Sequence, residues 1–292
     1  MQYRTIEAIV SPPNPHYVGD GFRVHNFIPT GHRLGMSRTN PFLLLDYNAP
    51  FYFSPSNIPR GVGVHPHRGF ETVTIAYKGK IEHQDSSGGG GIIAEGDVQW
   101  MTAASGILHK EFHELEFSKQ GGYFQMVQLW VNLPAQYKMS APKYQAVSNA
   151  SIPTYTLPDG GGILEIIAGK HKDVLGTIHT FTPIHVINAK LAIGAKEEFQ
   201  FPVSYTTALV VIEGSIKINN NDAVDVNHFV LFNNDAEIFT IEALQTDTIV
   251  LVISGEPIPE PIASHGPFVM NSQQELIQAF DDFQNGKFGY LE

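Results

Sequence analysis

Hydrophobic and polar residues alternate with a period of two along most of the chain, which is the pattern of half-buried β-strands. Residues 71–77 show it clearly, because Val73, Ile75 and Tyr77 share one face while Thr and Ala residues occupy the other. Turn-forming Gly, Asn, Asp and Pro residues separate this segment from others of the same kind. Further strands are predicted near residues 80–83, 92–94, 97–102, 107–112 and 123–133.

The second half of the chain repeats the design of the first. Residues 208–218 parallel residues 73–83, and the turn glycines Gly79 and Gly214 lie 135 positions apart. Later strands are predicted near residues 229–232, 237–242 and 247–253. This repeat favours an all-β protein of two tandem jelly-roll barrels, in which closing or doubling the sheet protects the strand edges. We place the boundary near residue 148, between barrels of residues 1–148 and 149–292.

The end of the chain changes to a helical pattern. Ser272 and Glu275 form an S-x-x-E capping box, and Gly286 is a natural stop. Between them, apolar residues recur at helical spacing: Leu276, Ile277, Phe280 and Phe283. We expect a short helix that packs on a barrel, with a partner-binding helix as the alternative.

Composition narrows the classes of function. The formal net charge of −11 repels phosphate backbones, so direct binding to nucleic acid is not expected. With no cysteine among 292 residues, any metal must be held by nitrogen and oxygen ligands. The sequence has no signal peptide pattern and no apolar run of the roughly 18–20 residues that span a bilayer. We therefore expect a cytoplasmic protein without membrane contact.

Two short motifs carry candidate chemistry. His65 and His67 are one residue apart, and His109 and Glu111 follow with the same spacing. Because positions i and i+2 of a strand face the same way, each pair presents both of its side chains on one side. If the two strands adjoin inside a barrel, three imidazoles and one carboxylate converge, a donor set that suits Fe, Mn, Ni, Cu or Zn.

Three acidic or histidine residues near these motifs have open roles. Glu71 competes with Glu111 for the place of the carboxylate ligand, because it lies four residues after His67. Gly69 between them could introduce a bulge that changes the face. We interpret His83 and Asp85 as the solvated end of a strand. The alternative is that the two side chains contact the metal ligands without binding the ion themselves.

Long blocks of the first half carry a family resemblance: residues 40–46 (NPFLLLD), 65–74 (HPHRGFETVT), 82–86 (EHQDS), 96–103 (GDVQWMTA), 105–111 (SGILHKE) and 128–134 (QLWVNLP). In these blocks the sequence resembles the pirin family of two-domain cupins. The resemblance implies two cupin barrels and a metal motif of H-x-H followed by H-x-E. It assigns the metal ligands to His65, His67, His109 and Glu111, favours one iron ion per chain, and leaves Glu71 behind the ligands.

The resemblance also implies a function. Some pirins oxidise the flavonol quercetin with dioxygen, so we expect a quercetin 2,3-dioxygenase-type oxidoreductase that acts on a small aromatic substrate. Glu111, or less favourably Glu71, is the candidate general base for the substrate hydroxyl. Other pirins assist transcription regulators, so the alternative is a metal- or redox-dependent binding module with a protein partner. A cupin sugar isomerase fits the ligands but not the blocks.

The second barrel departs from the motif. At the offset of 135 residues, Gln200 and Pro202 stand opposite His65 and His67. Near the second motif an offset of 131 residues places Thr240 and Glu242 opposite His109 and Glu111, a lone carboxylate where the first barrel has four ligands. We therefore expect a second barrel without metal.

Overall fold

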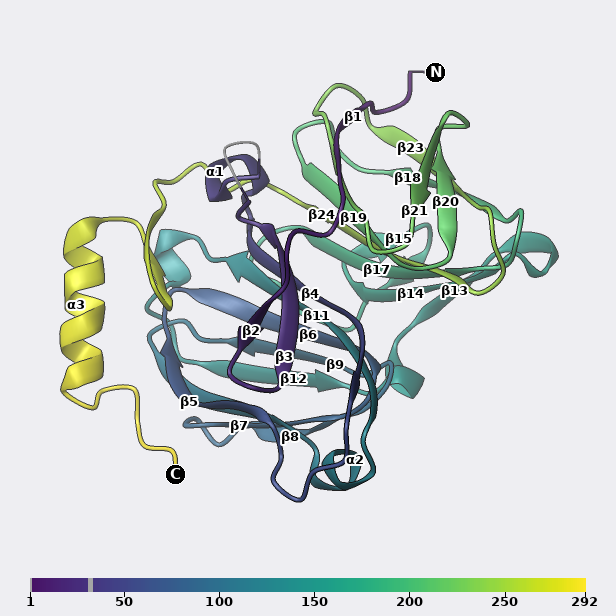
Figure 1. The fold of residues 1–292 in the computed structure, drawn as a ribbon. Coiled ribbons are helices and arrows are strands. Elements are labelled where there is room, and N and C mark those ends of the chain that lie inside the picture. Colours follow the sequence, from purple (N-terminus) through teal and green to yellow (C-terminus); the bar gives the residue numbers. More distant parts are fainter. Residues whose placement is uncertain (1, 31–33) are drawn as a thin grey trace. The chain divides into compact units, whose positions relative to one another are not determined.

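The computed structural model describes residues 2–30 and 34–292 and divides them into two compact units (Figure 1). The histidine unit comprises the described residues within 14–150 together with 258–292. The second unit comprises residues 2–13 and 151–257. The division at residues 150 and 151 lies beside the expected boundary, but both ends of the chain cross to the other unit.

Both ends cross because the N-terminal strand pairs with a sheet edge, and the C-terminal residues pack on an apolar surface, that lie far away in the sequence. Strand β1 (Ile6–Val10) pairs with β22 (Phe229–Phe232), which adds an edge strand to a sheet of the second unit. The C-terminal residues pack on the histidine unit through a buried apolar cluster that includes Phe268, Leu276 and Phe288. Pairings over such distances leave no local signal in the sequence.

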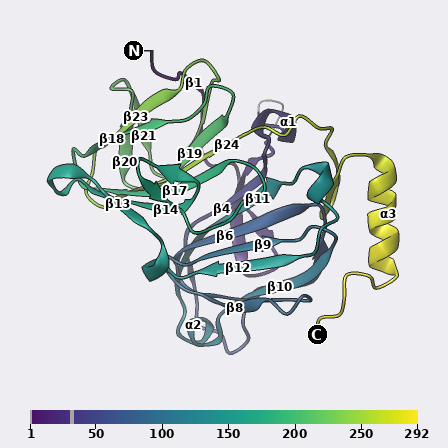
Figure 2. The same cartoon turned by 180° about the vertical axis from the view of Figure 1, so that it is seen from behind.

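Two antiparallel sheets form the histidine unit, and Figure 2 shows β6, β9 and β12 side by side in the larger one. The seven-stranded sheet runs in the order β12 (Lys143–Val147), β9 (Val98–Thr102), β6 (Phe70–Lys78), β11 (Gly122–Asn132), β4 (Phe42–Phe53), β3 (Phe22–Ile28) and β2 (His16–Val18). The four-stranded sheet runs in the order β5 (Gly61–His67), β10 (Ile107–His113), β7 (Ile81–Asp85) and β8 (Gly90–Ile93).

Short helices and one hairpin complete this unit. They are α1 (Met36–Thr39), α2 (Leu115–Gln120), η1 (Ala135–Tyr137), the hairpin of β25 (Ala263–His265) and β26 (Phe268–Met270), and α3 (Gln273–Gln284). The predicted cap of the last helix is confirmed, since the Ser272 side chain accepts a hydrogen bond from the Glu275 amide. Its apolar face differs from the prediction at two positions, because Ile277 is 63% exposed and Phe283 is 37% exposed.

The second unit has the same arrangement of sheets. Its larger sheet has the order β1, β22, β19 (Thr206–Glu213), β24 (Thr248–Gly255), β17 (Ile184–Leu191), β14 (Gly162–Ala168) and β13 (Thr154–Thr156). The smaller sheet has the order β18 (Lys196–Gln200), β23 (Ile238–Ala243), β20 (Ser215–Ile218) and β21 (Asp222–Asp225). The remaining elements are η2 (Asn149–Ser151), η3 (Pro158–Gly160), β15 (Lys170–His171) and β16 (Val174–Leu175). The predicted fold class, two tandem barrels with a short C-terminal helix, is confirmed.

The interiors of the two units differ in chemistry. The second unit contains one large apolar cluster, in which Phe199, Phe201, Phe232 and Phe239 are fully or almost fully buried. In the histidine unit an apolar cluster around Phe22, Phe53 and Phe124 fills only part of the interior, and buried His, Glu, Thr and Gln side chains occupy the rest. The described helices are all too short and too polar to span a bilayer.

Candidate metal centre

Strand pairing brings the two predicted motifs together. In the antiparallel register of β5 and β10, His65 stands opposite His109, and His67 stands opposite Ile107. Along β10 the burial alternates strictly, so that His109 and Glu111 lie on the buried face while Leu108 and Lys110 are only partly buried. The alternation of a β-strand therefore directs both residues into the barrel, as the spacing predicted.

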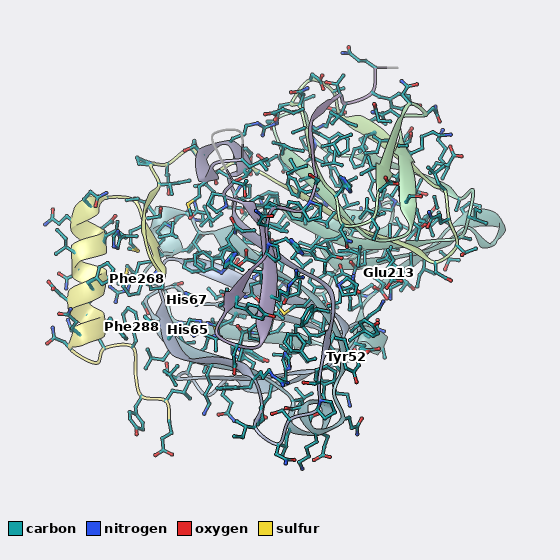
Figure 3. All side chains as sticks on the ribbon, in the orientation of Figure 1. Tyr52, His65, His67, Glu213, Phe268 and Phe288 are labelled. Atoms are coloured by element: carbon teal, nitrogen blue, oxygen red, sulfur yellow. The ribbon has the colours of Figure 1, made fainter. Side chains whose placement is uncertain are left out.

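The three histidine rings gather in one place. The ring centroid of His65 lies 4.1 Å from that of His109 and 4.9 Å from that of His67, and 4.7 Å separates His67 from His109. Their ligand nitrogens lie within 4.8 Å of one another. His65 is partly exposed while the other two are buried, so His65 stands at the solvent side of the cluster. Figure 3 labels His65 and His67 on the side of the barrel that carries α3.

Glu111 belongs to a second group that shares His109. Its carboxylate, the ring of His83 and the ring of His109 also have their ligand atoms within 4.8 Å of one another. Oε1 of Glu111 lies 3.9 Å from Nδ1 of His83 and 3.4 Å from the hydroxyl oxygen of Thr74. The structure thus places all four predicted residues in one neighbourhood, with His109 in the middle and Glu111 turned toward His83.

Hydrogen bonds fix which nitrogen of two histidines is free. Nδ1 of His65 lies 2.8 Å from the Gly63 carbonyl oxygen, and Nδ1 of His67 lies 3.4 Å from the Pro267 carbonyl oxygen. Because a carbonyl oxygen can only accept, both Nδ1 atoms carry the proton, and the lone pair of each ring is on Nε2. This is the arrangement in which metal-binding imidazoles are held by groups behind them.

His109 provides the test of whether a cation fits here. Both of its ring nitrogens are buried, and neither makes a hydrogen bond to the described residues. A buried polar group left without a partner costs about 1–3 kcal/mol. One of these two nitrogens carries the lone pair of the neutral ring, and together with two other imidazoles and a carboxylate it forms a donor set that binds first-row divalent metals. The residues present therefore fit a metal ion.

The electrostatics of the cluster favour neutral imidazoles. Burial lowers the pKa of His67 and of His109 well below the usual value, and the neighbouring His65 lowers both further. Both rings are therefore neutral near pH 7, and a neutral imidazole is the form that binds a metal. Burial also lowers the tendency of His83 to protonate, but Asp85 and Glu111 outweigh it and raise the pKa of His83.

His83 is the residue of this site that the sequence interpretation placed wrongly. Its ring is fully buried, and Asp85 beside it is 4% exposed, so the two do not form a solvated strand end. Nε2 of His83 lies 3.5 Å from Oδ2 of Asp85, and the Tyr144 ring stacks on the imidazole at 5.4 Å. The H-x-D spacing puts both side chains on one face of the strand, but it does not tell whether a neighbouring strand such as β10 covers that face.

Glu71 lies away from the cluster. The Thr102 hydroxyl donates to its carboxylate at 2.7 Å, and burial raises its pKa to about 7. Residues 71–75 of β6 keep a regular register with β9, so Glu71 and Thr74 face opposite sides of the strand. Since Thr74 contacts Glu111, the Glu71 side chain points to the other face, and the turn at Gly69 (φ +91°) accounts for the change of parity.

The corresponding positions of the second unit follow from its strand pairing. The pair of β18 and β23 occupies the place of β5 and β10 in the sheet order, and Phe199 stands opposite Phe239. Phe201 and Ile241 continue the buried face. The offsets of 135 and 131 residues, by which the sequence analysis matched the two barrels, are each too large by one residue in these strands. A shift of one residue exchanges the two faces of a strand, so the matched residues were those of the wrong face. Three phenylalanines and one isoleucine stand where the histidine unit has its four candidate ligands.

Comparison with known proteins places this chain among its relatives. The sequence model of the Pirin family matches residues 21–131, and that of the Pirin C-terminal cupin domain matches residues 186–289. The chain belongs to the pirin family. It is 46% identical over 98% of both chains to the Pseudomonas aeruginosa protein named "Putative quercetin 2,3-dioxygenase", and 37% identical to mouse Pirin over 93% of this chain and 90% of that one.

A solved structure agrees with this assignment over the full length. The crystal structure of quercetin 2,3-dioxygenase from Acinetobacter baumannii matches this chain with a TM-score of 0.92 and 46% identity, and the match covers 100% of both chains.

Proposed function

We propose that this pirin holds one divalent metal ion, iron, through His65, His67, His109 and Glu111, and that it cleaves a flavonol such as quercetin with dioxygen. The observation that carries the proposal is His109, whose two buried ring nitrogens have no hydrogen-bond partner among the described residues and which lies beside two other imidazoles and a carboxylate. The reaction class is supported by the 46% identity, over 100% of both chains, to the quercetin 2,3-dioxygenase of Acinetobacter baumannii.

The metal ion, when bound, would supply a Lewis acid that lowers the pKa of the flavonol hydroxyl and a centre that exchanges electrons. The protein would supply the rest. The ion would be bound by Nε2 of His65, Nε2 of His67 and a nitrogen of His109. The carbonyl groups of Gly63 and Pro267 keep the rings of His65 and His67 in the tautomer that leaves Nε2 free. Three imidazole ligands and one carboxylate would leave about two positions open on a six-coordinate ion.

Glu111 is the residue that would accept the proton of the substrate hydroxyl. Its Oε1 atom lies in a buried polar environment between Thr74 and His83, and the single proton of the Thr74 hydroxyl is donated to Gln128 at 2.8 Å. These contacts hold the carboxylate toward the interior of the barrel, where a proton taken from the substrate would not exchange freely with solvent. Glu71, on the other face of β6, is the weaker candidate for this role.

Turnover of quercetin by protein loaded separately with Fe²⁺, Mn²⁺, Ni²⁺ and Cu²⁺ tests the proposal. We expect loss of the flavonol absorbance with uptake of dioxygen, and loss of this activity in His109→Ala. His228→Ala, in the second unit, is the matched control and should retain it. No turnover with any of these metals, in protein that binds them, would contradict the enzymatic function and would favour the alternative, a metal-dependent binding module for a protein partner.

A further inference from the structure

The residues directly after strand β5 are held by a segment near the end of the chain. The Arg68 amide donates to the Pro267 carbonyl at 3.3 Å, and the Val269 amide donates to the Arg68 carbonyl at 3.0 Å. The same Pro267 carbonyl accepts from Nδ1 of His67. One carbonyl group of the C-terminal segment thus serves both the backbone beside a candidate ligand and the ligand ring itself. We name residues 263–288, which comprise β25, β26, α3 and the turn that follows, the C-terminal strap.

A buried ion pair ties the strap to the same place. Nη1 of Arg68 donates to Oδ2 of Asp282, on α3, at 2.8 Å, and the two side chains are only 4% and 9% exposed. Nε of Arg68 donates to the Ser105 carbonyl at 2.6 Å, and the guanidinium lies 4.6 Å above the Phe288 ring. Hydrogen bonds from Lys287 and from Arg68 hold the pKa of Asp282 far below its usual range.

Apolar packing extends this attachment to the second ligand strand. Phe268, Met270, Leu276, Ala279 and Phe288 form one buried cluster with the side chain of Leu108, the residue before His109. Figure 3 labels Phe268 and Phe288 on the same side of the barrel as His65 and His67. The strap therefore contacts β5 beside His67 and β10 beside His109.

We propose that the C-terminal strap positions His67 for metal binding, and that the ion pair between Arg68 and Asp282 holds the strap in place. The Pro267 carbonyl keeps the proton of His67 on Nδ1 and so keeps Nε2 free for the ion. The proposal rests on the proposed metal centre, and it adds that a segment about 200 residues away in the sequence sets the affinity of that centre. Loss of a group that orients a metal-binding imidazole typically costs 10–100-fold in affinity.

The test compares Asp282→Asn with Asp281→Asn, its exposed neighbour on the same helix. Co²⁺ is the probe, because its visible absorption reports the ligands, and a competing chelator gives the dissociation constant. We expect Asp282→Asn to bind Co²⁺ about 10-fold more weakly with an altered absorption spectrum, and Asp281→Asn to match the wild type. In the metal-free wild type, the ¹⁵N resonances of His67 should show the proton on Nδ1, and this signature should be lost in Asp282→Asn.

A second measurement needs no variant and covers the case in which Asp282→Asn does not fold. Because the coupling of two sites is reciprocal, Co²⁺ binding to the wild type should slow hydrogen exchange of the Val269 amide about 10-fold. Wild type that binds Co²⁺ without a change at Val269, or Asp282→Asn that binds as tightly as the wild type, would overturn the role of the strap and leave the metal centre intact. Wild type that does not bind Co²⁺ would overturn both.

Discussion

Gly69 offers a sharp test of how closely the strap approaches the histidine unit. Its φ of +91° is one that only glycine adopts readily, and a Cβ atom added there would lie 1.9 Å from the Val269 carbonyl oxygen. Gly88 has nearly the same φ, +90°, but nothing lies within 4 Å of its added Cβ. Gly88→Ala therefore measures the backbone cost alone, whereas Gly69→Ala adds the collision with the strap.

The size of the difference follows from the contacts. Gly88→Ala should cost about 1–2 kcal/mol, the usual penalty for a left-handed residue with a side chain. To relieve the contact in Gly69→Ala, the Val269 carbonyl must move by about 1.5 Å to an ordinary separation of 3.4 Å. That movement breaks the bonds from Val269 to Arg68 and from Lys138 to Val269, both 3.0 Å long, at about 1 kcal/mol each. Gly69→Ala should thus cost about 3–4 kcal/mol.

Urea denaturation followed by tryptophan fluorescence reports the unfolding of the histidine unit, because this unit contains both tryptophans, Trp100 and Trp130. The expected result is a lower urea midpoint for Gly69→Ala than for Gly88→Ala, which corresponds to a free energy of unfolding lower by about 2 kcal/mol. If the two variants unfold within about 0.5 kcal/mol of each other, the strap does not pack against Gly69 as the structure has it.

Three further predictions concern protons and metal. Burial raises the pKa of Glu71 to about 7, so the stability that its neutral form contributes is complete below the ordinary value of 4.5 and is lost as the pH rises through 7. In the wild type the free energy of unfolding should fall by about 3 kcal/mol between pH 5 and pH 8, and Glu71→Gln should remove this fall. Urea midpoints at the two pH values measure it, and parallel pH curves for wild type and variant would refute the burial argument. Elemental analysis should find one metal ion per chain, and two equivalents would show that the second unit binds metal despite Phe199 and Phe239. Since the pKa values of His67 and His109 are lowered, the midpoint of Co²⁺ release on acidification should fall below pH 6.5; release at a higher pH would mean that these rings are not ligands.

The fold, and the strand faces of the two candidate ligand pairs, could be predicted because both depend on local periodicity. A period of two located the strands, and the same period put His65 with His67 and His109 with Glu111 on common faces. The turn glycines Gly79 and Gly214 revealed the repeat without any knowledge of the pairing. These signals lie within a few residues of one another, so a single sequence carries them.

The features that escaped prediction depend on contacts between distant residues. His83 is buried because β10 pairs with β7, and a polar H-x-D strand end looks the same whether or not such a partner exists. The offsets to the second unit failed by one residue because loops differ in length, and the face of a strand changes with every residue. The bond from His67 to the Pro267 carbonyl joins positions 200 residues apart.

The central claim is that three imidazoles and one carboxylate hold one ion, and anomalous diffraction at the iron absorption edge tests it most directly. Crystals of the protein loaded with Fe²⁺ without oxygen should show one anomalous peak in the histidine unit, bonded to Nε2 of His65, Nε2 of His67, a nitrogen of His109 and the carboxylate of Glu111. A peak bonded to His83, His109 and Glu111 without His65 and His67, or the absence of any peak at this cluster, would contradict the account.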